Sequence, residues 1–262
     1  MNRRRLFLFT LIAALAVSLP AAAESFTAVA SNITGVVQKS SGGGWSQIRN
    51  HEKLRSGDTV KTGADGSVIL TFDSGNALSL SKLTTVTLAD ISRSGNAKKS
   101  IIKVDGGRML AVARPLKNSD SVFEVRTAQG SAGVRGSEVA VTVEENKTLF
   151  QIVEGRFNVT VGGVSAILEA GFQMDVAAGL TKPPEPAQID PAALQSLKKE
   201  LGDTKTAGFS ADALSAAEDA TLMELNDVFE NLQRANEGSC YTYCSYWSNG
   251  VCAYVYEHCH DY

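Results

Sequence analysis

The sequence predicts a mainly β protein: an antiparallel β-roll or sandwich of many short strands, then a short α-helical region and a small Cys-rich tail. From residue 25 to residue 180, apolar residues recur with a period of two, as in Val139, Val141 and Val143. Turn signals interrupt these runs about every 8–12 residues, which is typical of short antiparallel strands. No useful helical period precedes Pro183. Turns are expected at 63–66, 73–76, 105–107, 144–146 and 162–163.

The N-terminus has the pattern of a secretory signal peptide. Residues 1–5 are basic, residues 6–19 are apolar, and Pro-Ala-Ala-Ala at 20–23 offers a small-residue cleavage site before Glu24. The apolar run is shorter than the roughly 20 residues that span a bilayer. We therefore expect cleavage between Ala23 and Glu24, a periplasmic or secreted bacterial protein, and no membrane span in the mature chain. Export by the Sec or the twin-Arg route is left open.

Charge and composition narrow the function classes. Residues 1–23 hold three Arg and no acid, so the 25 basic and 28 acidic residues of the whole chain become 22 and 28 after cleavage, a net charge of −6. An acidic exported chain is a poor candidate for nucleic-acid binding, which needs clustered Lys and Arg. The 3 His residues lie in no recognisable nucleophile or metal motif. We therefore predict no enzymatic activity, no cofactor and no metal.

The segment from 123 to 143 places two alternating apolar strands around the small-residue core Gly130-Ser-Ala-Gly-Val-Arg-Gly-Ser137. Such a core permits tight turns and close strand approach. Together with Leu54-Arg-Ser-Gly-Asp-Thr-Val-Lys-Thr62, Val153-Glu-Gly-Arg-Phe-Asn-Val159 and Leu168-Glu-Ala-Gly-Phe-Gln173, it resembles the FecR-type periplasmic domain family from about residue 35 to residue 176. The chain has Ser137 where that family favours Thr, and Ala128 where it favours Pro. The motif residues expected to be structural are Gly130, Gly133, Arg135, Gly136, Ser137, Gly155 and Gly171.

The resemblance implies a kind of domain and a cellular compartment, but it implies no particular enzymatic reaction. Regulatory members of the family carry a cytoplasmic anti-sigma segment and a membrane helix before this domain, and here a cleavable signal stands in their place. The expectation is a stand-alone, non-catalytic binding or adaptor module that contacts an envelope protein, peptide or polysaccharide. The alternative is a structural, assembly or surface-associated scaffold, and a secreted enzyme is a less favoured third reading. Arg135 has two interpretations: it binds an anion or carboxylate through its guanidinium group, or it donates hydrogen bonds to neighbouring backbone carbonyls.

A different kind of sequence follows residue 180. A Pro-rich linker is expected at 181–189 and a two-helix region at 190–237. Asp190 fits an N-cap with Pro191 at the first helical position, and Gly202 fits a C-terminal cap. A second helix is expected from about Ser210. The helices either dock on the β-body, residues 25–180, or present a partner-facing hairpin. The apolar face of the first helix consists of Leu194, Leu197 and Leu201.

The tail, residues 238–262, holds all 4 Cys and all 6 Tyr of the chain. Asn249-Gly250 is a strong hairpin signal, and a two-residue turn there sets Cys240 opposite Cys259. Cys244 and Cys252 do not face each other in that register. Export favours two nested disulfides, Cys240–Cys259 and Cys244–Cys252. Metal binding through His258, Cys259 and His260 is the competing interpretation, although no closed four-ligand spacing is present.

Overall fold

The computed structural model describes residues 28–72, 74–94, 97–114, 121–134, 136–210, 240–248 and 251–259, the last two stretches as backbone only. Several expected features lie outside these residues: the signal peptide and its cleavage site, Arg135, the second helix after residue 210, and the turn at 249–250. Among the described residues, no helix is both long and apolar enough to cross a bilayer.

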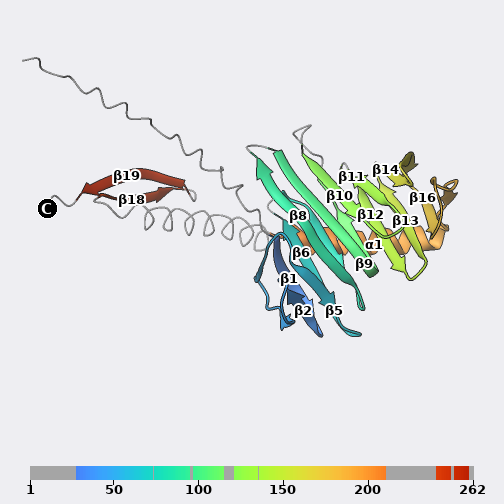
Figure 1. Cartoon of the computed structure of the whole chain (residues 1–262), viewed down its shortest axis with the longest axis horizontal. Coiled ribbons are helices and arrows are strands. Elements are labelled where there is room, and N and C mark those ends of the chain that lie inside the picture. Colours follow the sequence, from blue (N-terminus) through green and yellow to red (C-terminus); the bar gives the residue numbers. More distant parts are fainter. Residues whose placement is uncertain are drawn as a thin grey trace, which may run out of the picture.

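A 17-stranded mixed sheet folds over on itself into two layers, sheet A and sheet B, which share strand β9 (Ala97–Val112) (Figure 1). Sheet A has the order β3-β2-β5-β8-β9-β10-β11-β14-β15. Sheet B has the order β4-β1-β6-β7-β9-β12-β13-β16-β17. The strands of sheet A besides β9 are β2 (Val37–Ser40), β3 (Ser46–Gln47), β5 (Thr59–Thr62), β8 (Thr85–Ser94), β10 (Val122–Arg126), β11 (Ser131–Val134), β14 (Arg156–Val161) and β15 (Val164–Glu169). Those of sheet B are β1 (Ala28–Thr34), β4 (Lys53–Leu54), β6 (Ser67–Phe72), β7 (Ala77–Leu80), β12 (Glu138–Glu144), β13 (Lys147–Glu154), β16 (Phe172–Ala177) and β17 (Ala187–Gln188).

The expected turn at 105–107 is wrong, because β9 runs through it without reversing. Up to Gly106 the strand pairs with β8 in sheet A, and from Gly107 it pairs with β12 in sheet B. Gly107 has a φ of +89°, a left-handed conformation that glycine adopts at little cost. The two glycines therefore bend the strand from one layer into the other while both halves keep hydrogen-bonded neighbours.

An entirely antiparallel fold was expected, and the pairing of β9 with β10 corrects that expectation. These two strands are parallel, from Val122 opposite Lys99 to Arg126 opposite Lys103. β10 therefore runs in the same direction as the first half of β9, which it joins in sheet A, while the second half of β9 lies in sheet B.

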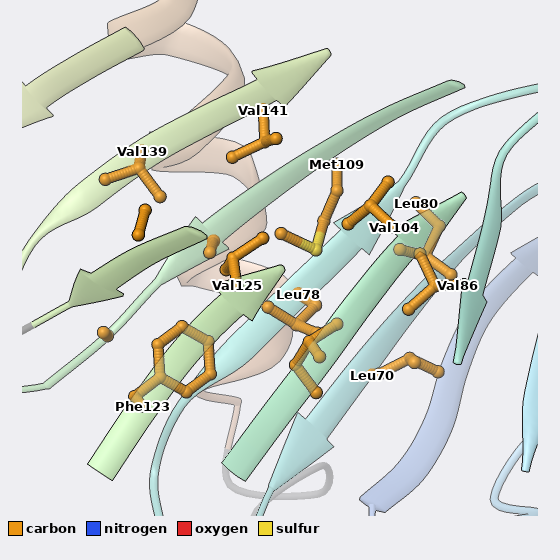
Figure 2. Close-up of a cluster of buried hydrophobic side chains, with 14 of the residues drawn as sticks. Leu70, Leu78, Leu80, Val86, Val104, Met109, Phe123, Val125, Val139 and Val141 are labelled. Carbon is orange, nitrogen blue, oxygen red and sulfur yellow. The ribbon is translucent and has the colours of Figure 1, made fainter. Parts of the chain in front are cut away.

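The core between the two sheets follows the period-two pattern of the sequence. Val68, Leu70 and Phe72 of β6 are fully buried between the layers. The rings of Phe150 and Phe157 pack edge to face, with their centres 6.3 Å apart. Figure 2 shows side chains of both sheets meeting in this core. The labelled residues are Leu70, Leu78, Leu80, Val86, Val104, Met109, Phe123, Val125, Val139 and Val141.

Helix α1 (Pro191–Gly208) lies along the outer face of sheet B (Figure 1). As predicted, Asp190 is the N-cap: its side chain accepts hydrogen bonds from the backbone N–H groups of Ala192 and Ala193. The apolar face meets a second cluster of buried residues, so this helix docks on the β-body. Within the expected linker, β17 adds a short strand to β16. The second cluster consists of Leu110, Val112, Ala140, Val153, Ile189, Leu197 and Leu201.

The prediction that Gly202 caps the helix is wrong. α1 continues to Gly208, and Phe209 takes the C-cap position. Tertiary packing overrides the weak helix propensity of Gly202, because Leu201 and Thr204 on either side of it are buried against the sheet. The end of the helix is also tied to the body, since the Thr71 hydroxyl donates a hydrogen bond to the Gly208 carbonyl.

The Cys-rich tail contains a separate two-stranded sheet of β18 (Cys240–Ser248) and β19 (Val251–Cys259). Its backbone register sets Cys240 opposite Cys259, as the position of Asn249-Gly250 predicts. Cys244 lies opposite Val255 and Cys252 opposite Trp247, so the inner cysteines are not register partners.

We expect disulfides Cys240–Cys259 and Cys244–Cys252 in the exported protein, although the inner bond requires a bulge or wider loop that departs from this register. Directly opposed strand residues have Cα separations that a disulfide tolerates, and the outer bond would contribute about 3 kcal/mol to the stability of the tail. Peptide mapping of the unreduced protein by mass spectrometry tests the connectivity. Reduction should loosen the tail and leave the melting of the β-body unchanged. Free thiols or stoichiometric zinc would contradict the pairing.

Candidate functional site

Three glycines of the family motif lie where the chain crosses between the sheets. Gly136 joins β11 to β12, Gly155 joins β13 to β14, and Gly171 joins β15 to β16. Their φ values are +60°, +82° and +85°, all in the left-handed region that glycine prefers. Each crossing needs a sharp change of direction, and these conformations provide it.

Adjacent crossings are in direct contact. The Ser137 hydroxyl, which is buried, donates a hydrogen bond to the carbonyl of Arg156 at 3.0 Å. A Cβ on Gly155 would lie 2.6 Å from the Ser137 oxygen and 2.8 Å from the carbonyl oxygen of Gly136. Gly171 donates its backbone N–H to the Ile152 carbonyl at 2.8 Å. The motif therefore offers close backbone packing in place of a pocket, which supports a structural role.

The other two motif glycines, Gly130 and Gly133, differ in the space around them. A Cβ on Gly130 would lie 2.7 Å from the carbonyl oxygen of Thr160, so this turn before β11 requires glycine. At Gly133 a Cβ would meet nothing within 4 Å. Arg135 lies outside the described residues, and both of its interpretations remain hypotheses.

Replacing Gly136 with Val is expected to lower the free energy of unfolding by about 1–3 kcal/mol, because a β-branched residue strongly disfavours a φ of +60°. Thermal or urea unfolding measures the change. Gly133→Val is the matched control, since it alters the same motif where a Cβ has room. A Gly136→Val variant with wild-type stability and lost partner binding would instead assign Gly136 to a ligand site.

A polar cleft of about 450 Å³ lies at the family motif of residues 54–62, and its lining includes Arg55, Ser56 and Asp58. Its buried carboxylate, Asp58, accepts hydrogen bonds from the Ser41 hydroxyl at 2.5 Å and from the Arg55 backbone N–H at 2.8 Å. Lys39 and Glu52, which also line the cleft, form an ion pair at 2.7 Å. These groups satisfy one another, so the motif again stabilises the fold. Among the described residues, no cluster of three or more His, Cys, Asp or Glu could hold a metal ion.

The free edge of sheet A is a stronger candidate for a binding site. β15 pairs with β14 on one side, and the described strands include no partner on the other. The outermost strands β3, β4 and β17 are two residues long, whereas β15 spans Val164–Glu169. Val164 is 50% exposed and Ile167 is 58% exposed. Sequence reasoning missed this edge, because strand order cannot be read from alternation alone, although the lack of Lys and Pro in β15 is a signal.

The fold is a two-layer β-sandwich whose motif glycines lie at the crossings between sheets and whose strand β15 forms a long open edge. Residues 58–158 match the family model described as FecR protein. This match confirms the resemblance to the FecR family over that part of the chain.

Two crystal structures of a protein described as a "putative anti-sigma factor from Parabacteroides distasonis ATCC 8503" are similar to this chain, with TM-scores of 0.44 and 14% sequence identity. The alignments cover 53% of this chain and 63% and 62% of those chains, so this chain spans less than two thirds of their length. No curated protein matches the sequence.

Proposed function

We propose that this protein is a non-catalytic adaptor of the bacterial cell envelope, exported by its signal peptide, which binds a protein partner at the exposed edge of β15. The FecR-type region supports the class of protein, and the free edge of β15 is the observation that carries the proposal.

The chemistry of this edge suits strand addition. An outermost strand presents unpaired N–H and C=O groups to which an extended segment of another protein can pair. Proteins usually protect such edges with short strands or with Lys and Pro, as the two-residue strands β3, β4 and β17 illustrate. β15 has no Lys or Pro, and Val164 and Ile167 add exposed apolar area beside the backbone groups.

Photocrosslinking in intact cells tests the proposal. A photoreactive residue at position 167 should capture a distinct envelope protein, whereas one at Leu83 should not. Leu83 is a suitable control because it is also an exposed apolar residue, 66% accessible, and lies far from this edge in the sheet order.

A blocking variant gives the second arm of the experiment. Because Ile167 itself is changed in this arm, the photoreactive residue is moved to position 165 of the same strand. Ile167→Lys adds a charge to the edge and should abolish crosslinking from position 165, while Leu83→Lys should leave that crosslinking intact. Equal capture from positions 167 and 83, or capture that survives Ile167→Lys, would refute the edge as the binding site. Capture of a second copy of this chain would favour the scaffold alternative.

A further inference from the structure

A row of hydroxyl and cationic side chains crosses sheet A from one side to the other. The strand registers place its members directly beside one another on consecutive strands. With adjacent strands about 4.8 Å apart, the row is roughly 30 Å long. In spatial order it consists of Ser40, Thr59, Thr87, Lys103, Arg126, Ser131, Thr160 and Ser165.

This row lies on the outer face of the sheet. Its members alternate along their strands with core residues such as Val60, Val125 and Val159, and each of them is exposed or half-buried. Within the row, the hydroxyls of Thr59 and Thr87 lie 3.0 Å apart, and those of Thr160 and Ser165 lie 2.8 Å apart. Each hydroxyl can both donate and accept hydrogen bonds, so it retains capacity for a ligand.

The cations in the middle of this face are paired with carboxylates. Arg126 forms two hydrogen bonds of 2.9 Å with the carboxylate of Glu124, and Lys103 lies 2.7 Å from Asp105. The hydrogen bonds from Arg126 also lower the pKa of Glu124, so the pair stays ionised in mildly acidic solution. Nearby, Lys99 pairs with Asp90 at 2.7 Å. The two cations of the row and Lys99 are thus each paired with a carboxylate, which weakens the attraction of this part of the face for an anionic polymer.

An exposed aromatic residue stands at one end of the row. Continuing the register of β2 and β3 by one residue sets Trp45 opposite Ser40. Trp45 is 48% exposed, and the ammonium group of Lys61, which also lies on the outer face, is 5.9 Å from the centre of its ring. A Cβ added to any of the three glycines at 42–44, just before Trp45, would meet nothing within 4 Å. Open space therefore surrounds the loop that carries Trp45.

From this arrangement we infer that the outer face of sheet A binds an extended, neutral polysaccharide. Sugar hydroxyls match the row of Ser and Thr hydroxyls, and the apolar face of a sugar ring matches an exposed indole. A row crossing eight strands suits a chain polymer better than a small molecule. Protein interfaces are depleted in Ser and Lys, and nucleic acids require uncompensated cations, so both suit this face less well. The row ends at Ser165 on the edge strand β15, but this inference rests on side chains of the outer face and not on the backbone of that edge. Trp45, Thr59 and Thr87, which carry its test, lie at the opposite end of the row.

Affinity gel electrophoresis of the full mature protein tests the inference with three probes. Hydroxyethylcellulose and konjac glucomannan are neutral and extended, and alginate is acidic. We expect at least one neutral probe to retard the protein more than alginate does. Trp45→Ala, and separately Thr59→Val with Thr87→Val, should each weaken that binding about tenfold or more. Val keeps the shape and strand preference of Thr while removing the hydroxyl.

Control variants separate the row from the rest of the chain. Thr206→Val removes an exposed hydroxyl from α1 and should leave binding unchanged. In a W247F variant, Trp45 is the only Trp, and its fluorescence should respond to the polysaccharide that retards the protein. Melting curves establish that each variant is folded. Retardation by alginate alone, by no probe, or with wild-type strength in both row variants would overturn the inference.

Discussion

Replacing Gly107 with Ala is expected to lower the free energy of unfolding by about 3–5 kcal/mol, among the largest effects of a single substitution in this protein. A Cβ at this position would lie 2.5 Å from the carbonyl oxygen of Leu83 and 2.5 Å from the Cα of Thr84, both backbone atoms. The φ of +89° adds strain for any L-residue with a side chain.

The clash would also disturb the hydrogen bonds between the bend of β9 and the segment that links β7 in sheet B to β8 in sheet A. The backbone N–H of Arg108 donates to the Thr84 hydroxyl at 3.0 Å, and that hydroxyl lies 3.1 Å from the Arg108 carbonyl. Moving Thr84 aside would weaken this contact, so relaxation cannot remove the cost.

Urea unfolding followed by circular dichroism measures the effect. Gly106→Ala is a close control: the residue is the immediate neighbour, its φ is not in the left-handed region, and its Cβ would meet nothing within 4 Å. That variant should unfold within about 1 kcal/mol of the wild type. Similar losses in the two variants would show that the bend of β9 does not depend on Gly107.

Leu201→Ala is expected to cost about 2–5 kcal/mol, since it removes a fully buried side chain from the contact between α1 and sheet B. Leu201 belongs to the same buried cluster as Leu110, Val112 and Ala140, which lie on the sheet face opposite the main core. Loss of this packing should also expose the apolar strip and promote self-association.

Thermal unfolding with light scattering tests both consequences. Lys199→Ala is the control on the same helix, because Lys199 is exposed and Ala is at least as good a helix former. Unchanged melting in Leu201→Ala would mean that α1 contributes little to the β-body. In that case a chain ending at residue 180 should fold with wild-type stability.

Local features of the sequence predicted much of this fold. Alternation in β12 identified Val139, Val141 and Val143 as core residues, because successive side chains of a strand face opposite sides. Asp190 followed by Pro191 identified the start of α1, because capping depends on neighbouring residues alone. The pairing of Cys240 with Cys259 in the backbone register followed from the position of one tight turn.

The tertiary structure decided what depends on residues far apart in the chain. The helix passes through Gly202 because sheet B buries Leu201 and Thr204, and the turn signal at 105–107 became a bend because both halves of β9 find partners. The free edge of β15 and the hydroxyl row arise from the order and register of many strands. Each strand reveals which of its residues face outward, but only long-range pairing sets those residues side by side.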